Sequence, residues 1–339
     1  MSVTKLPVDM STVFISFNPT GFADTALDLL KTAGHTVTLY KKSSGIPRKE
    51  LFAQTTGKDA VLCLLTDRID EDFFKAAGPN LKIVANYAVG FDNVDLEAAR
   101  KHKVVVTNTP SDKVSEAVAE QTFALMITLA RRISEADVYA KAKKFKGWDP
   151  TLMLGTDLYG KTLGIIGAGR IGGAVARRAV TGFGMRLIYS DMRKNETLEK
   201  EFKAEYLPME KVLGQADFVS LHVPLLPSTR HLISSAEFAQ MKKNAFLINT
   251  ARGPVVDEKA LLRALRTKRI AGAGLDVFEC EPAIDCDVTD NLELKNFANV
   301  VLTPHTASAT IEAREDMARV AALNILAVLA GKPALNPAK

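Results

Sequence analysis

Three residues in the carboxyl-terminal half of the chain have side chains that can bind a small acid and move a proton. Arg252 directly follows a predicted strand in Asn-Thr-Ala-Arg-Gly, and His305 follows another in Thr-Pro-His-Thr-Ala-Ser. A guanidinium can hold a carbonyl and a carboxylate oxygen in one plane, and an imidazole exchanges protons near neutral pH. Glu281 can accept a hydrogen bond from that imidazole and favour its protonated form. Together they are typical of a proton-transfer site that also holds an anion.

Taken singly, each of these three residues is also common in a plain surface loop. An arginine before glycine is often a surface charge, a histidine after proline is often a loop residue, and a glutamate before proline is often a solvated turn residue. The remaining histidines are weaker candidates, because three lie in turns or a polar loop and His222 lies in a strand, packed or facing a cofactor edge: His35, His102, His222 and His231.

A glycine-rich turn supplies the second sign of chemistry. Gly167 allows a sharp turn out of a strand, Gly169 allows backbone amides to approach a pyrophosphate, and Gly172 allows the next helix to pack close to the sheet. The amino end of that helix then faces the phosphates. The neighbouring elements fall where such a site needs them: a strand at 163–166, a helix at 171–179 and a second strand at 185–189. The sequence therefore predicts a dinucleotide site.

Asp191, at the end of the second strand, indicates which dinucleotide binds. Its carboxylate can accept hydrogen bonds from both adenosine ribose hydroxyls and repels a 2′-phosphate, which favours NAD over NADP. Arg193 and Lys194 follow at once and could partly neutralise a phosphate, so NADP is the alternative. With a nicotinamide cofactor, the protein must hold a substrate C–O group near the ring, move one proton and stabilise charge on oxygen. The three residues of the carboxyl-terminal half suit that task.

The elements that must position these residues alternate between strand and helix. In the first hundred residues we expect strands at 13–17, 36–40, 60–65, 83–86 and 104–107, with helices near 22–33, 48–54, 71–77 and 96–102. A second series begins at Thr162, with strands near 163–166, 185–189, 218–223, 245–249, 272–275 and 300–303. Such alternation implies parallel sheets with helices on their faces. The predicted fold class is α/β, with two Rossmann-like, doubly wound units.

A long helix predicted at 115–133 lies between the two series. Its expected start is Ser115, with Glu116 and Glu120 in the first turns. Its apolar positions nearly encircle it, so it must be buried on most sides, either between domains or against a second subunit, which we favour. Asp112 and Lys113 before it form a plausible hinge. A last helix is expected at 311–330.

Composition limits the class of protein. At 339 residues the chain is too long for one ordinary core, so two domains are expected. The net charge is +5, and no dense Lys/Arg stripe is interleaved with aromatics, which argues against nucleic-acid binding. No apolar run has membrane-spanning length and the amino terminus has no signal-peptide pattern, so we expect no membrane partner and a cytoplasmic location.

The three cysteines offer neither a disulfide framework nor a metal site. They are odd in number and sparse, which agrees with a reducing compartment. Cys63 lies in an apolar run and is expected to be buried. Cys280 and Cys286 have Asp285 and Asp287 nearby, but no second cluster of histidines or cysteines completes four ligands, so no metal is predicted.

Five motifs, in order, resemble those of the D-isomer-specific 2-hydroxyacid dehydrogenases, and within that family the chain is most similar to glyoxylate and hydroxypyruvate reductases. They are the segments 86–95, 167–172, 249–256, 274–282 and 303–308, and the similarity runs from about residue 12 to residue 331. The resemblance implies two Rossmann-like domains with the active site in the cleft between them, and a homodimer. The first domain, which binds substrate, then comprises 1–112 and 308–339. The NAD-binding domain comprises 113–307 and includes the dimerisation helix 115–133.

The resemblance also implies a role for individual residues. Arg252 would bind the substrate oxygens, Glu281 would pair with the histidine, and His305 would be the acid/base. The backbone amides of Val89 and Gly90 would hold the substrate carboxylate, and Arg170 and Ile171 would lie against the pyrophosphate. The cofactor cleft would be lined by Val223, Pro224 and Thr250, and Asp276 would meet the nicotinamide carboxamide. Trp148 occupies the place from which relatives send an aromatic residue into the neighbouring subunit's active site, or is a plain core or interface residue.

Differences between members of this superfamily narrow the function. Formate dehydrogenases carry glutamine where Glu281 stands, and phosphite dehydrogenases carry lysine where Val89 stands, so neither substrate is expected. No regulatory domain is expected after Gly331. The resemblance implies NAD(H)-dependent interconversion of a small 2-keto acid and its D-2-hydroxy acid, with glyoxylate or hydroxypyruvate favoured. D-lactate or D-3-phosphoglycerate dehydrogenase is the alternative enzyme, and a corepressor-like NADH-binding protein is the alternative of another class.

Overall fold

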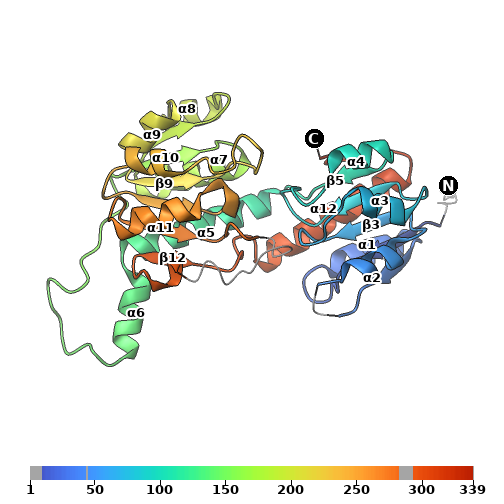
Figure 1. Cartoon of the computed structure of the whole chain (residues 1–339), viewed down its shortest axis with the longest axis horizontal. Coiled ribbons are helices and arrows are strands. Elements are labelled where there is room, and N and C mark those ends of the chain that lie inside the picture. Colours follow the sequence, from blue (N-terminus) through green and yellow to red (C-terminus); the bar gives the residue numbers. More distant parts are fainter. Residues whose placement is uncertain (1–9, 43–44, 282–292, 339) are drawn as a thin grey trace, which may run out of the picture. The chain divides into compact units, whose positions relative to one another are not determined.

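The computed structural model describes residues 10–42, 45–281 and 293–338, and the chain divides into two compact units (Figure 1). The first unit contains the residues up to Val114 and those from Ala309 onward. The second unit runs from Ser115 to Ser308.

The first unit is built on a parallel sheet with the strand order β2-β1-β3-β4-β5. Its strands are β1 (Thr12–Ile15), β2 (Thr36–Leu39), β3 (Ala60–Cys63), β4 (Ile83–Asn86) and β5 (Val105–Thr107). Its helices are α1 (Asp24–Thr32), α2 (Arg48–Thr55), α3 (Glu71–Ala77), α4 (Leu96–Lys101) and α12 (Ile311–Leu329). The strands β3 and β4 are buried at every position, as central parallel strands covered on both faces should be. The late helix α12 packs on α1 and on the central strands.

The second unit is built on a larger parallel sheet with the order β12-β11-β10-β9-β6-β7-β8. Its strands are β6 (Thr162–Ile166), β7 (Arg186–Ser190), β8 (Glu205–Tyr206), β9 (Phe218–Leu221), β10 (Phe246–Asn249), β11 (Gly272–Leu275) and β12 (Val300–Leu302). The chain winds outward from β6 in one direction to β8 and returns to β9 on the other side. Ligands of such sheets bind at the carboxyl ends of the strands, where the winding direction switches.

Helices cover both faces of this second sheet. They are α5 (Asp112–Ala130), α6 (Ile133–Lys141), α7 (Arg170–Phe183), α8 (Glu196–Phe202), α9 (Met209–Gln215), α10 (Ser235–Gln240) and α11 (Glu258–Arg266). One core cluster joins the sheet to α9, α10 and α11. The other joins it to α5, α7 and α8, and the rings of Phe123 and Phe183 stack there with 4.8 Å between centroids.

The predicted fold class is confirmed, because every strand pair in both sheets is parallel. The predicted limits of the long helix were wrong by one turn. It begins at Asp112 rather than Ser115, because the hydroxyl of Ser111 accepts a hydrogen bond from the amide of Val114 at 3.2 Å and caps the helix. It ends at Ala130, where Arg132 takes a left-handed conformation with φ +53° and a separate helix, α6, begins.

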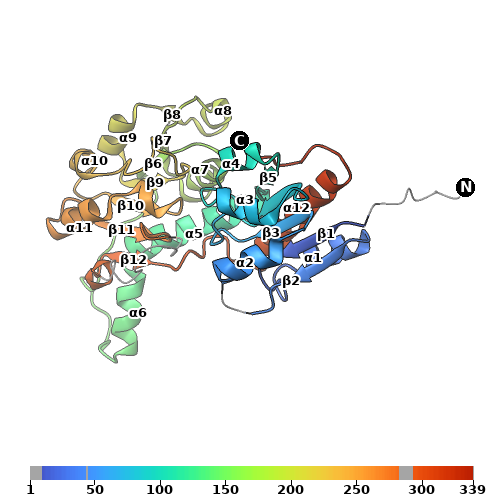
Figure 2. The ribbon, with the colours of Figure 1, turned by 45° about the vertical axis from the view of Figure 1, so that its right-hand side comes forward.

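The segment formed by α6 and the loop after it is the least buried part of the second unit. Figures 1 and 2 both show it standing away from the sheet. Helix α6 has no buried residue, and every residue from 142 to 152 is exposed. Among the residues that the structure describes, no helix is long and apolar enough to cross a membrane.

Candidate active site

The three candidate catalytic residues follow three neighbouring strands of the second sheet. Arg252 comes after β10, Glu281 after β11 and His305 after β12. Because parallel strands end at the same edge of a sheet, all three lie at its carboxyl edge, where ligands of this fold class bind.

The histidine and the glutamate form a direct pair. Nδ1 of His305 lies 2.5 Å from Oε2 of Glu281, and the other oxygen of Glu281 accepts a hydrogen bond from the amide of Phe278 at 3.2 Å. Both side chains are only partly buried, with exposed fractions of 29% and 18%. The glutamate therefore fixes the ring through Nδ1 and leaves Nε2 as the nitrogen that can exchange a proton with a substrate.

Asp276 holds the turn that carries His305. Its fully buried carboxylate accepts hydrogen bonds from the amides of Thr306 and Ala307 at 2.9 and 2.8 Å and from the hydroxyl of Thr303 at 2.5 Å. Its carbonyl oxygen accepts the amide of His305 at 2.8 Å. Sequence reasoning gave Asp276 only a cofactor contact and missed this role, because its partners lie about 30 residues further along the chain.

A buried asparagine shapes the loop of Arg252. The side-chain oxygen of Asn249 accepts a hydrogen bond from the amide of Ala251 at 3.0 Å. Its side-chain NH2 group donates a hydrogen bond to the carbonyl oxygen of Arg252 at 2.9 Å. The guanidinium of Arg252 donates to the carbonyl of Ala251 at 2.9 Å and is half-buried. The turn is thereby fixed, and Arg252 leaves the strand in an extended conformation.

The glycine turn has the geometry that a bound pyrophosphate needs. Gly167 has φ +95°, and a Cβ there would lie 2.7 Å from the backbone of His222. A Cβ on Gly172 would lie 2.1 Å from the carbonyl oxygen of Gly167, so the helix sits too close to the turn for any side chain. A Cβ on Gly169 would meet no atom within 4 Å, which leaves open space above the amino end of α7.

Asp191 lies directly after β7 and is tied to the glycine turn. Its Oδ2 accepts the amide of Ala168 at 2.6 Å, and the side-chain amide of Asn195 donates to the carbonyl of Ala168 at 2.8 Å. Asp191 is half-buried, so its carboxylate can also meet a ribose. The open space at Gly169 and this carboxylate fit an adenine dinucleotide. Asn195 was not singled out from the sequence, because it belongs to no glycine motif.

The remaining predicted cofactor residues lie at the same edge of the second sheet. Arg170 and Ile171 form the first turn of α7, Val223 and Pro224 follow β9, and Thr250 follows β10. The hydroxyl of Thr250 lies 3.1 Å from that of Thr122 on α5.

The predicted substrate residues outside the second sheet lie on loops. Val89 and Gly90 follow β4 in the first unit. The side-chain amide of Asn108 donates to the carbonyl oxygen of Val89 at 2.6 Å, and the side-chain amide of Asn86 donates to that of Gly90 at 2.9 Å. Trp148 lies in the loop after α6 and is 86% exposed, so it is not a core residue of its own chain.

His222 is packed in the protein and its imidazole is uncharged at neutral pH. Its Nε2 lies 2.9 Å from the hydroxyl of Ser220, and among the described residues its buried Nδ1 has no hydrogen-bond partner. Burial lowers the pKa of His222 to about 3. It therefore stays neutral near pH 7, which leaves His305 as the stronger candidate for an acid.

The cysteines gave one correction. Cys63 is free and buried, as expected. Cys280, however, is disulfide-bonded, which contradicts the expectation that the chain forms no disulfide. The sequence count failed because an odd number of cysteines does not prevent the formation of one disulfide. Cys286, Asp285 and Asp287 lie outside the described residues, and within the described part no group of His, Cys, Asp and Glu side chains is arranged to hold a metal ion.

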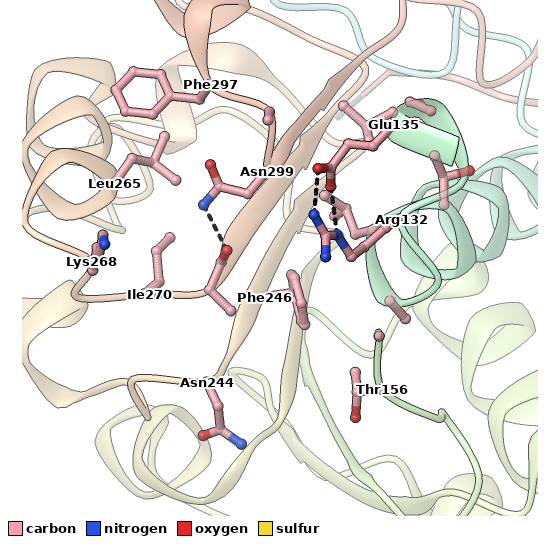
Figure 3. Close-up of a pocket in the computed structure, with 18 of the residues that line it drawn as sticks. Arg132, Glu135, Thr156, Asn244, Phe246, Leu265, Lys268, Ile270, Phe297 and Asn299 are labelled. Carbon is pink, nitrogen blue, oxygen red and sulfur yellow. Dashed lines mark hydrogen bonds and ion pairs between the residues drawn. The ribbon is translucent and has the colours of Figure 1, made fainter. Parts of the chain in front are cut away.

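A separate pocket of about 740 Å³ lies at the opposite edge of the second sheet (Figure 3). Phe246 and Asn299, at the amino ends of β10 and β12, line it together with residues of α5, α6 and α11. Figure 3 shows Arg132 pointing at Glu135, with hydrogen bonds of 2.9 and 2.7 Å. The catalytic candidates follow the carboxyl ends of the strands, so this pocket is not their site.

Sequence comparisons identify similar proteins. Residues 123–307 match the family model of the NAD-binding domain of D-isomer specific 2-hydroxyacid dehydrogenases. A glyoxylate reductase of Korarchaeum cryptofilum is 50% identical over 87% of this chain and 86% of its own length. One from Thermococcus litoralis is 47% identical over 87% of this chain and 88% of its own.

Solved structures show the same fold. The TT0316 protein from Thermus thermophilus has a TM-score of 0.87 at 40% identity, covering 97% of this chain and all of its own. The D-lactate dehydrogenase of Aquifex aeolicus, complexed with NAD and lactic acid, has a TM-score of 0.82 at 32% identity, with 94% and 96% covered. An acyclic imino acid reductase in complex with NADPH and D-Arg has a TM-score of 0.84 at 27% identity, and the match covers 97% of this chain and 100% of that one.

Proposed function

Because the chain belongs to the family of D-isomer specific 2-hydroxyacid dehydrogenases, we propose that it reduces a small 2-keto acid, with glyoxylate or hydroxypyruvate as the preferred substrate. The relatives named glyoxylate reductase support the choice of substrate. The observation that carries the reaction is the hydrogen-bonded pair of His305 and Glu281 at the carboxyl edge of the sheet that also bears the glycine turn.

In this proposal each residue of the site has a separate role. The guanidinium of Arg252 binds the substrate's keto oxygen and carboxylate, which aligns and polarises the carbonyl group. Protonated His305 donates its Nε2 proton to the keto oxygen as the hydroxyl forms, while Glu281 keeps Nδ1 occupied and stabilises the imidazolium beforehand. When bound, NADH supplies the hydride that reduces the carbonyl carbon. The amides of Val89 and Gly90 are further candidates for the substrate carboxylate.

For the cofactor we propose that NADH is preferred to NADPH. Asp191 is held at the end of β7 by the amide of Ala168, so its negative charge stays where a 2′-phosphate would lie. Arg193 and Lys194 are exposed and their positive charge only partly offsets it.

An assay of 2-keto acids with both reduced cofactors tests substrate and cofactor together. We expect the highest kcat/KM for glyoxylate or hydroxypyruvate with NADH, at least about tenfold above the same reaction with NADPH, because a 2′-phosphate would meet the Asp191 carboxylate. Initial rates from NADH absorbance provide the measurement. A preference for pyruvate would identify a D-lactate dehydrogenase, and higher kcat/KM with NADPH would overturn the cofactor assignment.

We further propose that the enzyme is a homodimer and that the segment 133–159 contacts the second copy. Seven exposed large apolar side chains lie on this segment, which is an unusual concentration for a surface that faces only water: Ile133, Val138, Phe145, Trp148, Leu152, Leu154 and Tyr159. Burying them needs a partner with matching apolar surface, and a second copy offers the same surface. Trp148, the most exposed of the seven, is proposed to reach the neighbour's active site.

Trp148→Asp tests this assembly. The wild-type protein should sediment at twice its chain mass of 36.8 kDa, whereas Trp148→Asp should shift toward the single-chain mass or lose kcat/KM as a dimer. Leu335→Asp, at an exposed apolar residue of the first unit, is the matched control and should change neither. A Trp148→Asp protein with unchanged mass and unchanged kcat/KM would remove Trp148 from both roles.

A further inference from the structure

One buried carboxyl group of the second unit has no part in the mechanism above. Glu258 is the first residue of α11, and it is only 5% exposed. Charged side chains are almost never buried to this extent unless their polar atoms are engaged. The hydrogen bonds of Glu258 therefore indicate the role of this buried carboxyl group.

Glu258 and Glu279 hold each other by reciprocal hydrogen bonds. Oε1 of Glu258 accepts the backbone amide of Glu279 at 2.6 Å, and Oε2 of Glu279 accepts the backbone amide of Glu258 at 3.3 Å. Glu279 lies two residues before Glu281. The start of α11 is thus fastened to the loop that carries the partner of the proposed acid.

His231 extends this connection to a third segment. Its Nε2 lies 2.6 Å from Oε1 of Glu279, and its backbone amide donates to the carbonyl of Pro254 at 2.7 Å. Pro254 lies two residues after Arg252. Through the side chains of Glu258 and Glu279 and through both the side chain and the backbone of His231, the loop of Arg252 is therefore joined to the loop of Glu281.

The two loops also touch directly through their backbones. A Cβ added to Gly253 would lie 1.7 Å from the carbonyl oxygen of Phe278 and 2.5 Å from the amide nitrogen of Glu279. The amide of Phe278 in turn donates to Glu281. Any shift of the segment around Glu279 is therefore passed both to the residue after Arg252 and to the carboxylate that orients His305.

We propose that Glu258 is a positioning residue for the proton transfer: through Glu279 and His231 it fixes the distance and direction of Glu281 relative to Arg252. The inference rests on the proposed function, because it concerns the same pair of Glu281 and His305. Glu258 itself touches neither substrate nor cofactor in this scheme. Its effect on the reaction passes through the loop 278–281.

The charge of Glu258 gives this role a distinctive pH dependence. Burial is the main cause that raises the pKa of Glu258 to about 7; the negative charges of Glu279 and Glu281 act in the same direction, and the hydrogen bond from the amide of Glu279 opposes them. The other titratable groups of the cluster are His231 and Arg230, which lie beside Glu279, and Asp257 at the start of the same helix. Glu258 therefore gains its negative charge around neutral pH, at its contact with the loop that carries Glu281.

Two variants of Glu258 separate position from charge. The glutamine side chain of Glu258→Gln cannot ionise, but its oxygen can still accept the hydrogen bond from the amide of Glu279. We expect this variant to retain kcat within about threefold near pH 6, and any change of kcat that accompanies the ionisation of Glu258 around pH 7 should be lost, because the glutamine amide does not ionise. Glu258→Ala removes the acceptor, and we expect kcat to fall about 10- to 100-fold at all pH values with little change in KM.

A stability measurement accompanies the kinetics. The folded-state pKa of Glu258 lies above its ordinary value of 4.5. Its protonated form therefore stabilises the fold fully below about pH 4.5, and this contribution is lost as the pH rises through about 7. Glu258→Gln should remove that part of the pH dependence of the unfolding midpoint.

Asp217→Asn is the matched control. Asp217 is also a carboxylate that accepts a backbone amide, that of Thr162 at 2.9 Å, but it lies at the opposite edge of the same sheet. The Asp217→Asn substitution should lower Tm without moving the pH profile of kcat. If Glu258→Ala lowers Tm yet leaves kcat and the pH profile unchanged, the positioning role is wrong. Full activity of a His305→Ala protein would instead show that the proposed function itself fails.

Discussion

His305→Ala should lower kcat for keto-acid reduction by about 10²- to 10⁴-fold, the usual contribution of a positioned general acid. NADH should still bind with nearly unchanged affinity, because the glycine turn and Asp191 lie on β6 and β7, away from the loop after β12. Stopped-flow or steady-state turnover together with NADH fluorescence titration measures both quantities. Loss of turnover with retained binding also excludes a protein that only binds NADH and recruits partners.

His102→Ala is the matched control for this experiment. His102 is also a partly exposed histidine paired with a glutamate, with Nε2 3.1 Å from Oε1 of Glu71, but it lies in the first unit after α4. Its loss should leave kcat unchanged. Equal kcat in wild type and His305→Ala would show that another group supplies the proton.

Gly172→Ala should weaken NADH binding strongly, whereas Gly173→Ala should not. The added methyl group at residue 172 would lie 2.1 Å from the carbonyl oxygen of Gly167, so the helix or the turn must move. Overpacking of this kind costs about 1–3 kcal/mol, and here the displaced backbone is the one that faces the pyrophosphate. We therefore expect Kd for NADH to rise at least about tenfold, as measured by calorimetry, and Tm to fall.

Gly173→Ala is the closest possible comparison, because the two positions are adjacent in α7. A Cβ on Gly173 meets nothing within 4 Å, and alanine is about 1 kcal/mol better than glycine inside a helix. Its Kd for NADH should be unchanged and its Tm equal or higher. Equal Kd values in the two variants would mean that the close approach at Gly172 does not shape the cofactor site.

The sequence predicted both sheets, apart from the two-residue edge strand β8, and the edge at which the candidate site lies, because short buried strands, glycine turns and helix caps leave local signals. It predicted the pairing of His305 with Glu281 from the residue types, and the family resemblance implied the same pair. It placed the start of the long helix at Ser115 rather than Asp112, since the capping role of Ser111 depends on where the preceding loop lies. Local patterns carry no such information.

The sequence also missed the buried supports of the site. Asp276 was assigned only to the cofactor, and neither Glu258 nor Glu279 was singled out, because a glutamate at a helix start or in a turn usually faces solvent. Their importance arises from contacts between segments far apart in the chain, such as residues 231, 258 and 279. Spacing along one sequence does not reveal such contacts.

The backbone at His305 has a consequence for how the protein can be improved. Its φ of +54° lies in the left-handed region, which costs a residue with a side chain about 1–2 kcal/mol and which glycine adopts freely. The hydrogen bonds of Asp276 hold the turn in this conformation. Selection for thermal stability alone would therefore favour loss of the imidazole. Any programme that raises the Tm of this enzyme must screen for turnover at the same time.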